Sequence, residues 1–212
     1  MRLGPRPVPA APLDLPPSIG ARIAGMELVS PGLPYLPSYS DALRRGWAHD
    51  NLRLAAAAQE ELERIACSPI DFVESLTDPE ARGSPIALPD GSMVPRLPGF
   101  RLWMWDGEFC GSIELRWQAG TTELPAFCLG HIGYSVVPWK RRRGYATQAL
   151  RRVLPMARER GLAYVDLTTD PDNVASQRVI LANGGRIERR FRTLDAFGNT
   201  EKLLLRIELG GE

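Results

Sequence analysis

Residues 130–147 constrain this chain more than any other stretch, and they run GHIGYSVVPWKRRRGYAT. An apolar strand ends at Pro138, four basic residues follow from Lys140 to Arg143, and Gly144 opens a long amphipathic helix. The exposed N–H groups and positive dipole of a helix N-terminus attract anions, and glycine lets an anion approach the backbone. The pattern therefore predicts a phosphate-binding turn between a strand and a helix.

Length and composition favour a soluble protein with one domain and a sizeable core. The chain has 212 residues, of which 44% are hydrophobic, and no run of eighteen apolar residues predicts a membrane span. The N-terminus is too rich in proline for the apolar core of a signal peptide, so we expect a cytoplasmic protein without a membrane partner. The net charge of +1 argues against a protein devoted to binding nucleic acid.

The arginines, cysteines and histidines narrow the chemistry. Because Lys140 and Lys202 are the only lysines among 26 basic residues, 26 minus 2 leaves 24 arginines, a bias typical of GC-rich coding. Three unclustered cysteines predict reduced thiols, mostly buried, and no disulfide framework. The two histidines, His49 and His131, are far apart in sequence, so we expect no zinc site and no other metal cofactor.

Proline and turn formers divide the first half of the chain. Nine of the nineteen prolines lie in the first 37 residues; we expect residues 1–22 to form a weakly ordered segment and 23–212 a single domain. A first strand is predicted at 23–29, followed by helices over 38–76 with Ser38 and Ser40 as candidate N-caps. Residues 77–99 predict a loop, long enough to be a functional flap.

Strand patterns dominate the second half. An Asp106-Gly107 turn predicts a hairpin of 100–105 and 108–117. A third strand is predicted within 130–138, followed by a helix over 144–160 that has one buried stripe, a kink at Pro155 and a C-terminal cap at Gly161. A strand at 164–168 is predicted to lie parallel to or beside the third strand. The chain then continues with a predicted helix over 174–182, capped by Asn173, and a closing hairpin of 186–193 and 202–209.

Two motifs in this order resemble those of the GCN5-related N-acetyltransferase (GNAT) family. The residues in and around them also resemble a bacterial branch of predicted acetyltransferases in that family. The family signature Q/R-x-x-G-x-G/A matches 141–146, and N-x-x-S/A before an apolar helix ending in glycine matches 173–184. The resemblance covers about 100–209. It implies an α/β (α+β) fold with a mixed, mostly antiparallel twisted sheet of about six to seven strands and helices on both faces. Motifs for nucleoside triphosphates and dinucleotides are absent from the sequence.

The resemblance also implies a reaction, in which a primary amine attacks acetyl-coenzyme A directly in a ternary complex. The backbone of 142–147 then holds the pyrophosphate, Val136 N–H meets the developing oxyanion, and Asn173 and Ser176 contact the cofactor arm. The full set of implied cofactor-binding residues is Val136, Val137, Arg141, Arg142, Arg143, Gly144, Tyr145, Ala146, Thr147, Asn173 and Ser176. The amine acceptor is not readable, and a homodimer stays open.

The family's usual proton carriers are missing. The position of its thiolate-protonating tyrosine holds Ile180, and that of a glutamate base holds Thr168. We therefore predict His131 as a substitute base, because imidazole accepts a proton near neutral pH. Tyr134, Glu114 and Asp170 are the alternatives, and orientation of a neutral amine without a base is another.

Two other functions fit parts of the sequence. Loss of the usual acid and base is compatible with an acyl-coenzyme A-binding regulatory domain, or one with weak catalysis. The basic run 140–143 is compatible with a nucleic-acid patch, which the near-neutral charge and the scarcity of aromatic residues disfavour.

Overall fold

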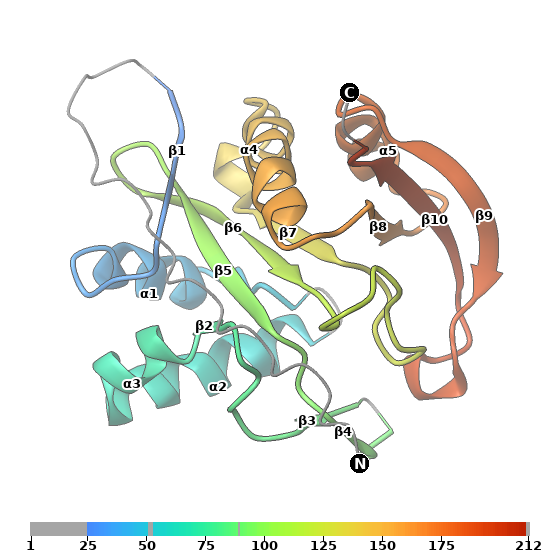
Figure 1. Cartoon of the computed structure of the whole chain (residues 1–212). Helices are drawn as coiled ribbons and strands as arrows, with labels where there is room; N and C mark the ends of the chain where they lie inside the picture. The colour runs from blue at the N-terminus through green and yellow to red at the C-terminus, as the bar shows by residue number, and fades with distance from the viewer. Residues whose placement is uncertain (1–24, 51–52, 89, 211–212) are drawn as a thin grey trace, which may run out of the picture.

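Two antiparallel sheets form the centre of the molecule, and they are set apart from each other (Figure 1). The computed structural model describes residues 25–50, 53–88 and 90–210. The strands are β1 (Glu27–Val29), β2 (Thr77–Asp78), β3 (Ile86–Ala87), β4 (Met93–Val94), β5 (Gly99–Trp105), β6 (Phe109–Arg116), β7 (Ile132–Val136), β8 (Tyr164–Thr169), β9 (Arg186–Arg192) and β10 (Glu201–Glu208). The first sheet has the order β1-β5-β6-β7, with β2 also on β5, and the second has the order β8-β10-β9. The predicted α/β class is confirmed, but the predicted single sheet is divided in two.

Helices cover both faces of the first sheet. Figure 1 shows α1, α2 and α3 below it, α4 on the opposite face, and α5 beside the second sheet. Their bounds are α1 (Leu36–Arg44), α2 (Leu54–Cys67), α3 (Pro69–Glu74), α4 (Tyr145–Glu159) and α5 (Val174–Leu181), with short 3-10 turns η1 (Pro138–Lys140) and η2 (Asp195–Phe197). Among the described residues, no helix combines the length and apolarity that crossing a membrane requires.

Alternation along β5 and β6 creates two hydrophobic cores. Phe100, Leu102 and Met104 of β5 point into a core shared with α4, α5 and the second sheet. Trp103 points the other way, into a core with α1, α2 and α3. Because successive strand residues face opposite sides, one hairpin supplies both cores. The predicted hairpin with its Asp106-Gly107 turn is confirmed.

Helix α4 follows the predicted stripe. Ala149, Leu150, Val153 and Ala157 are buried in the first core, and the helix continues past Pro155 to Glu159. Gly161 follows the helix with φ of 79°, and its N–H donates to the Arg158 carbonyl at 2.8 Å. The left-handed conformation that glycine permits ends the helix there, as predicted.

The N-terminal half departs from the sequence predictions in three places. Ser38 and Ser40 lie inside α1 and do not cap it; the Ser38 hydroxyl instead accepts the Phe109 N–H at 2.8 Å. The predicted loop 77–99 contains β2, β3 and β4. Of the predicted first strand 23–29, the described residues 25–29 are a strand only at 27–29; residues 23–24 and the segment 1–22 lie outside the described residues.

Strands β7 and β8 meet at one point and then separate. The His131 N–H donates to the Asp166 carbonyl at 2.7 Å, and the Asp166 N–H donates to His131 Nδ1 at 2.9 Å. Gly130 allows this contact, since a Cβ there would lie 3.0 Å from the Asp166 carbonyl oxygen. In the described part of the chain, no other backbone hydrogen bond joins the two strands, and β8 pairs with β10 along its opposite edge. The prediction that β8 lies parallel to or beside β7 therefore holds only at this contact.

Candidate functional site

The turn between β7 and α4 presents unpaired backbone donors. Arg142 and Gly144 both have positive φ, 64° and 77°, and α4 begins directly after Gly144. The described residues supply no acceptor to the N–H groups of 142–147, and no side chain caps the helix. A Cβ on Gly144 would meet only Gln148 Nε2, at 3.7 Å, so open space lies beside this backbone. A positive-φ turn at a helix N-terminus is a fit site for a phosphate group.

The four basic side chains of this turn have different surroundings. Lys140 is buried, with Nζ 3.0 Å from both carboxylate oxygens of Asp106. Arg141 Nε donates to the Val136 carbonyl at 3.3 Å, and Arg143 Nη1 lies 4.0 Å from Asp106 Oδ2. Arg142 is exposed and makes no ion pair within the described residues. The sequence alone does not distinguish these four basic residues, whereas in the structure Arg142 is the cation most available to a ligand.

Asp106 is a residue of this site that sequence analysis assigned only to a turn. Its carboxylate accepts the Tyr145 hydroxyl at 2.6 Å as well as Lys140, and Glu108 adds a contact of 2.6 Å to Lys140 Nζ. Burial raises the pKa of Asp106, but hydrogen bonds from Tyr145 and Lys140 outweigh burial and hold it below its usual value. An ionised carboxylate thus lies beneath the turn, and no sequence motif predicts it there.

The outer edge of β7 offers one further donor. The Val137 N–H donates to the Cys110 carbonyl at 2.9 Å, so it faces β6. In an antiparallel strand, backbone groups alternate between the two edges, which turns Val136 N–H toward the side where β7 and β8 separate. The Val136 carbonyl, bonded to Arg141, lies on that side too. The geometry favours Val136, and not Val137, as the backbone contact predicted for a cofactor arm.

Tyr134 of β7 reaches the first turn of α5. Its hydroxyl lies 2.9 Å from Ser176 Oγ, and the Asn173 side chain caps α5 by accepting the Ser176 N–H at 3.1 Å. Burial raises the pKa of Tyr134 to about 12, although the hydrogen bond to Ser176 opposes this shift. The predicted residues Tyr134, Asn173 and Ser176 therefore come together, next to the separating ends of β7 and β8. Ile180, at the missing tyrosine's position, is buried in the first core.

The surroundings of His131 conflict with the predicted role as a base. The side chain is fully buried; Nδ1 accepts the Asp166 N–H and Nε2 lies 2.8 Å from the Thr122 carbonyl. Burial lowers the pKa of His131 below its usual value, so the neutral ring is favoured. With Nε2–H donating and Nδ1 accepting, both nitrogens bond to backbone. These are the contacts of a histidine that joins two chain segments.

We therefore expect His131→Ala to affect folding more than chemistry. The substitution leaves two partly buried backbone groups without their partners and opens a cavity where the ring was, a cost of about 2 kcal/mol or more that lowers Tm by several degrees. Turnover per folded molecule at 25 °C stays within about twofold, with an unchanged pH profile. Thermal unfolding and steady-state kinetics measure the two effects. Loss of an acidic kinetic pKa with unchanged Tm would restore the catalytic prediction.

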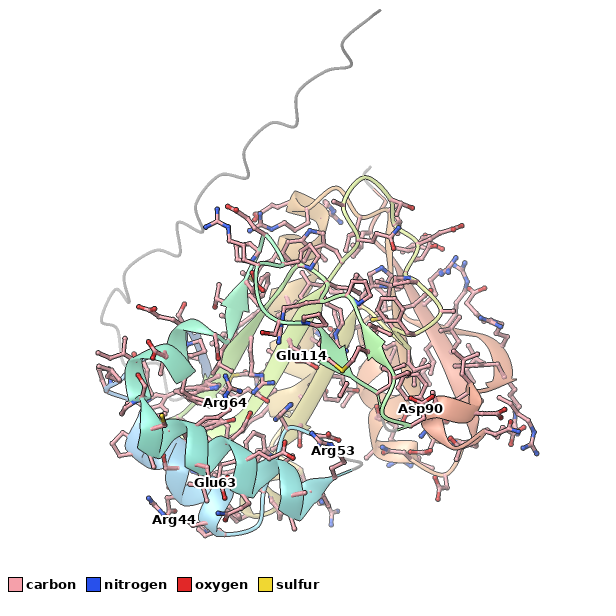
Figure 2. The ribbon with its side chains drawn as sticks, turned by 90° about the horizontal axis from the view of Figure 1, so that it is seen from below. Arg44, Arg53, Glu63, Arg64, Asp90 and Glu114 are labelled. Atoms are coloured by element: carbon pink, nitrogen blue, oxygen red, sulfur yellow. The ribbon has the colours of Figure 1, made fainter. Side chains whose placement is uncertain are left out.

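Charged side chains occupy the other face of β6 and β7. Glu114 Oε2 lies 3.7 Å from Arg101 Nη2, and a Cβ on Gly133 would lie 3.0 Å from Glu114 Oε1 and 3.3 Å from Arg116 Nη2. Glu114 thus lies over the β7 backbone; Figure 2 shows it on the sheet face beside α2. Burial raises its pKa, but Arg116 and Arg101 outweigh burial and lower it. Asp170, another predicted alternative, is paired with Lys202 at 2.5 Å.

A buried ion pair anchors this charged face to α2. Arg101 Nη1 lies 3.1 Å from Glu61 Oε1, His49 Nδ1 lies 3.1 Å from the same oxygen, and the Tyr39 hydroxyl donates to Oε2. Burial raises the pKa of Glu61, but hydrogen bonds and charge from His49 and Arg101 lower it to about 2. Glu61 is therefore ionised at neutral pH and fixes Arg101 beside Glu114.

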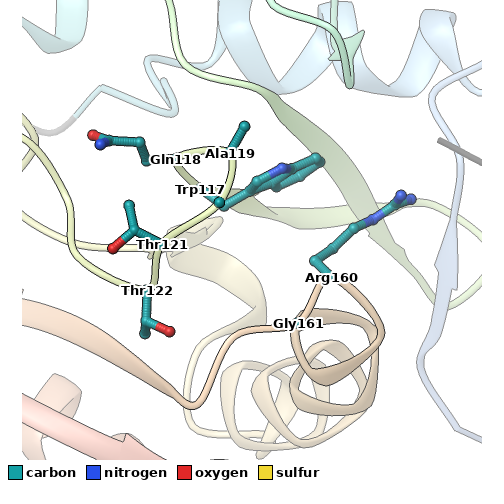
Figure 3. A pocket seen from close by; sticks show the side chains of 8 residues that line it. Trp117, Gln118, Ala119, Thr121, Thr122, Arg160 and Gly161 are labelled. Carbon is teal, nitrogen blue, oxygen red and sulfur yellow. The ribbon is translucent and has the colours of Figure 1, made fainter. Parts of the chain in front are cut away.

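A surface hollow of about 490 Å³ lies elsewhere, at the far end of α4 (Figure 3). Trp117, Thr121 and Thr122 line it together with Arg160 and Gly161. Because Gly161 follows the C-terminus of α4 whereas Gly144 precedes its N-terminus, this hollow is distinct from the phosphate-binding turn. Within the described residues, no three His, Cys, Asp or Glu side chains gather as metal ligands.

Comparisons with known proteins agree with this geometry. A family model described as an acetyltransferase (GNAT) domain matches residues 46–186. The fold is similar to the microcin C7 self-immunity acetyltransferase MccE, solved with acetyl-CoA and AMP (TM-score 0.58, 13% identity, 86% of this chain and 92% of that chain). It is also similar to a putative ribosomal-protein-serine acetyltransferase from Vibrio cholerae (TM-score 0.54, 15% identity, 86% of this chain and 93% of that chain). A third similar structure is RimL, a ribosomal L7/L12 alpha-N-protein acetyltransferase, in complex with coenzyme A (TM-score 0.55, 12% identity, 86% of this chain and 93% of that chain). No curated protein matches the sequence.

Proposed function

Since this chain belongs to the GNAT family of acetyltransferases and uses acetyl-coenzyme A as its acyl donor, we propose that it acetylates the primary amine of a small molecule or a peptide by direct attack in a ternary complex. The observation that carries the proposal is the set of unpaired N–H groups at 142–147, next to the point where β7 and β8 separate. The similar structures bear names of both protein and small-molecule acetyltransferases, which leaves both acceptor classes open.

The turn before α4 and the edge of β7 bind and orient the donor. Backbone N–H groups of 142–147 hold the pyrophosphate, and the exposed Arg142 adds positive charge. Arg141, through the Val136 carbonyl, steadies the strand edge from which Val136 N–H points outward. Bound acetyl-coenzyme A supplies an already activated thioester. Val136 N–H stabilises negative charge on the thioester oxygen during attack.

Tyr134 and Ser176 form the proton-donating pair in this proposal. Their hydroxyls lie 2.9 Å apart, and Asn173 fixes Ser176 at the start of α5. With its pKa raised to about 12, Tyr134 keeps its proton at neutral pH. Ser176 donates a proton to the leaving sulfur and regains one from Tyr134, whose proton is replaced from solvent. This pair performs the task for which the usual tyrosine is absent at Ile180.

Glu114 orients the acceptor in this proposal. It is ionised at neutral pH and lies over β7 on the face opposite α4. A carboxylate in this place attracts an ammonium group and accepts, directly or through water, the proton that the attacking amine must lose. The neighbouring Arg101 and Arg116 hold Glu114 in one orientation. His131 has no part in proton transfer here.

A thiol-release assay tests the proposal. Amino acids, polyamines, peptides with free N-termini and aminoglycosides serve as acceptors, and acetyl-, propionyl- and succinyl-coenzyme A serve as donors. We expect steady release with acetyl-coenzyme A and at least one amine class, and an N-acetylated product by mass spectrometry. Coenzyme A binding by calorimetry without turnover on any amine would favour the regulatory alternative.

A further inference from the structure

The tip of the β5–β6 hairpin reaches the turn that precedes α4. Asp106 lies at that tip, 34 residues from Lys140 and 39 from Tyr145 in sequence. Its two oxygens contact Lys140 Nζ at 3.0 Å each, and Oδ2 also accepts the Tyr145 hydroxyl at 2.6 Å. Lys140 ends η1 and Tyr145 starts α4, so one carboxylate bonds to both sides of the segment 141–144.

The contact is protected from solvent and is thus more than a surface ion pair. The Lys140 and Asp106 side chains are only 9% and 14% exposed, and Glu108 supplies a second carboxylate to the lysine. Charged hydrogen bonds of this kind are stronger than neutral ones, and screening by salt is weaker for a partly buried pair. The charge of Lys140 is neutralised by two carboxylates, so it stabilises contacts within the protein.

The segment between these two anchors needs an external restraint. Arg142 adopts a left-handed conformation that costs a non-glycine residue about 1 kcal/mol or more, and Gly144 has the same conformation with maximal freedom to leave it. The N–H groups of 142–144 have no partner in the described residues to fix their direction, whereas α4 itself aligns those of 145–147. Something outside the segment must hold these donors in place, and Asp106 contacts both of its ends.

We infer that Asp106 is a positioning residue of the coenzyme A site: its carboxylate clamps Lys140 and Tyr145 and so presets the backbone donors of 142–147 before the cofactor binds. The inference rests on the proposed function, in which this segment holds the pyrophosphate. Asp106 itself touches neither the cofactor nor the acceptor. Its effect is on affinity for the donor, because a preset site loses less conformational freedom on binding.

The hairpin tip also joins this clamp to the acceptor side of the molecule. Trp105, next to Asp106, packs edge-on against Tyr35 just before α1, with ring centroids 4.8 Å apart. The Phe109 N–H donates to Ser38 of α1, and its ring packs against Trp47. The clamp is therefore built on a rigid aromatic base, which explains why a hairpin turn can hold a loop in place.

Asp106→Asn tests the clamp, with Asp195→Asn as the matched control because Asp195 is an exposed aspartate in η2. Hydrogen exchange of 139–147 is measured without ligand, and coenzyme A affinity is measured by calorimetry. We expect faster exchange across this segment and about tenfold weaker coenzyme A binding, as follows if the preset conformation falls to about a tenth of the population. The KM for acetyl-coenzyme A rises in the same way, whereas kcat and the acceptor KM stay within about twofold. The control matches the parent throughout.

Two results overturn the inference: parental exchange rates in Asp106→Asn, or parental affinity for coenzyme A. Should this variant fail to fold, Tyr145→Phe removes one of the two contacts, and the same measurements then shift in the same direction by about threefold. Exchange is read without cofactor, so it decides whether Asp106 orders the segment even if the parent binds no coenzyme A. That last outcome would refute the proposed function and leave the clamp as a separate observation.

Discussion

Gly144→Val is expected to weaken acetyl-coenzyme A binding by at least about a hundredfold. Gly144 has φ of 77°, which costs a β-branched residue about 1–2 kcal/mol, so the backbone at the start of α4 leaves its conformation. The donors of 142–147 then no longer converge, and the new side chain fills the open space beside them. Each loss of about 1.4 kcal/mol is tenfold in affinity, and both losses fall on the same ligand. Calorimetry with acetyl-coenzyme A gives the result.

Gly161→Val is a closely matched control. Gly161 lies at the opposite end of α4 with φ of 79°, and a Cβ there meets no atom within 4 Å. The backbone penalty is therefore the same, while the phosphate-binding turn is untouched. We expect a similar fall in Tm for both variants and parental cofactor affinity for Gly161→Val alone. Equal affinity of the two variants for acetyl-coenzyme A would contradict the assignment of the pyrophosphate to this turn.

Tyr134→Phe is expected to lower kcat about a hundredfold, and Ser176→Ala to do the same, with little change in acetyl-coenzyme A affinity. General acid catalysis contributes about 10²–10⁴-fold, and the two hydroxyls act in series in the proposed pair. The double variant is then no slower than the slower single variant, because groups that act as a unit are not additive. Single-turnover kinetics and calorimetry separate kcat from binding.

The pH dependence has a definite sign. Tyr134 donates a proton only while protonated, so its contribution is lost as pH rises through its pKa of about 12. The parent should thus show no loss of kcat from this group up to pH 10. Tyr164→Phe, on β8 outside the pair, is the control and keeps parental kcat. A kcat for Tyr134→Phe within threefold of the parent would contradict the assignment.

Local patterns made most of the fold predictable. The Asp106-Gly107 turn between two strand-like stretches identifies a hairpin, and the stripe of α4 identifies a helix with its glycine ends, because each signal lies within a few residues. The division into two sheets was not predictable. It depends on how β7 and β8 diverge beyond the contact between His131 and Asp166, which are 35 residues apart, and no local pattern encodes that divergence.

The candidate site divides in the same way. The turn 141–146 and the cap at Asn173 are encoded by local motifs, whereas the contact of Tyr134 with Ser176 joins residues 42 positions apart and was not predicted. The clamp by Asp106 carries no local signal beyond its turn. His131 was predicted as a base because imidazole accepts a proton near neutral pH. The sequence does not reveal that both of its ring nitrogens are already bonded to backbone groups.

The separation of β7 and β8 has a consequence for how the protein responds to its donor. In the part of the chain that the structure describes, the two sheets share one hydrogen-bonded contact, at His131 and Asp166, and otherwise they pack on the common core around α4. A molecule lying between the strands replaces missing sheet contacts, so it acts as part of the folded architecture and not only as a reactant. At a concentration of a hundred times Kd, such a ligand adds about 2.7 kcal/mol to the free energy of unfolding. The lifetime of the protein against unfolding and proteolysis would then follow the supply of its acyl donor.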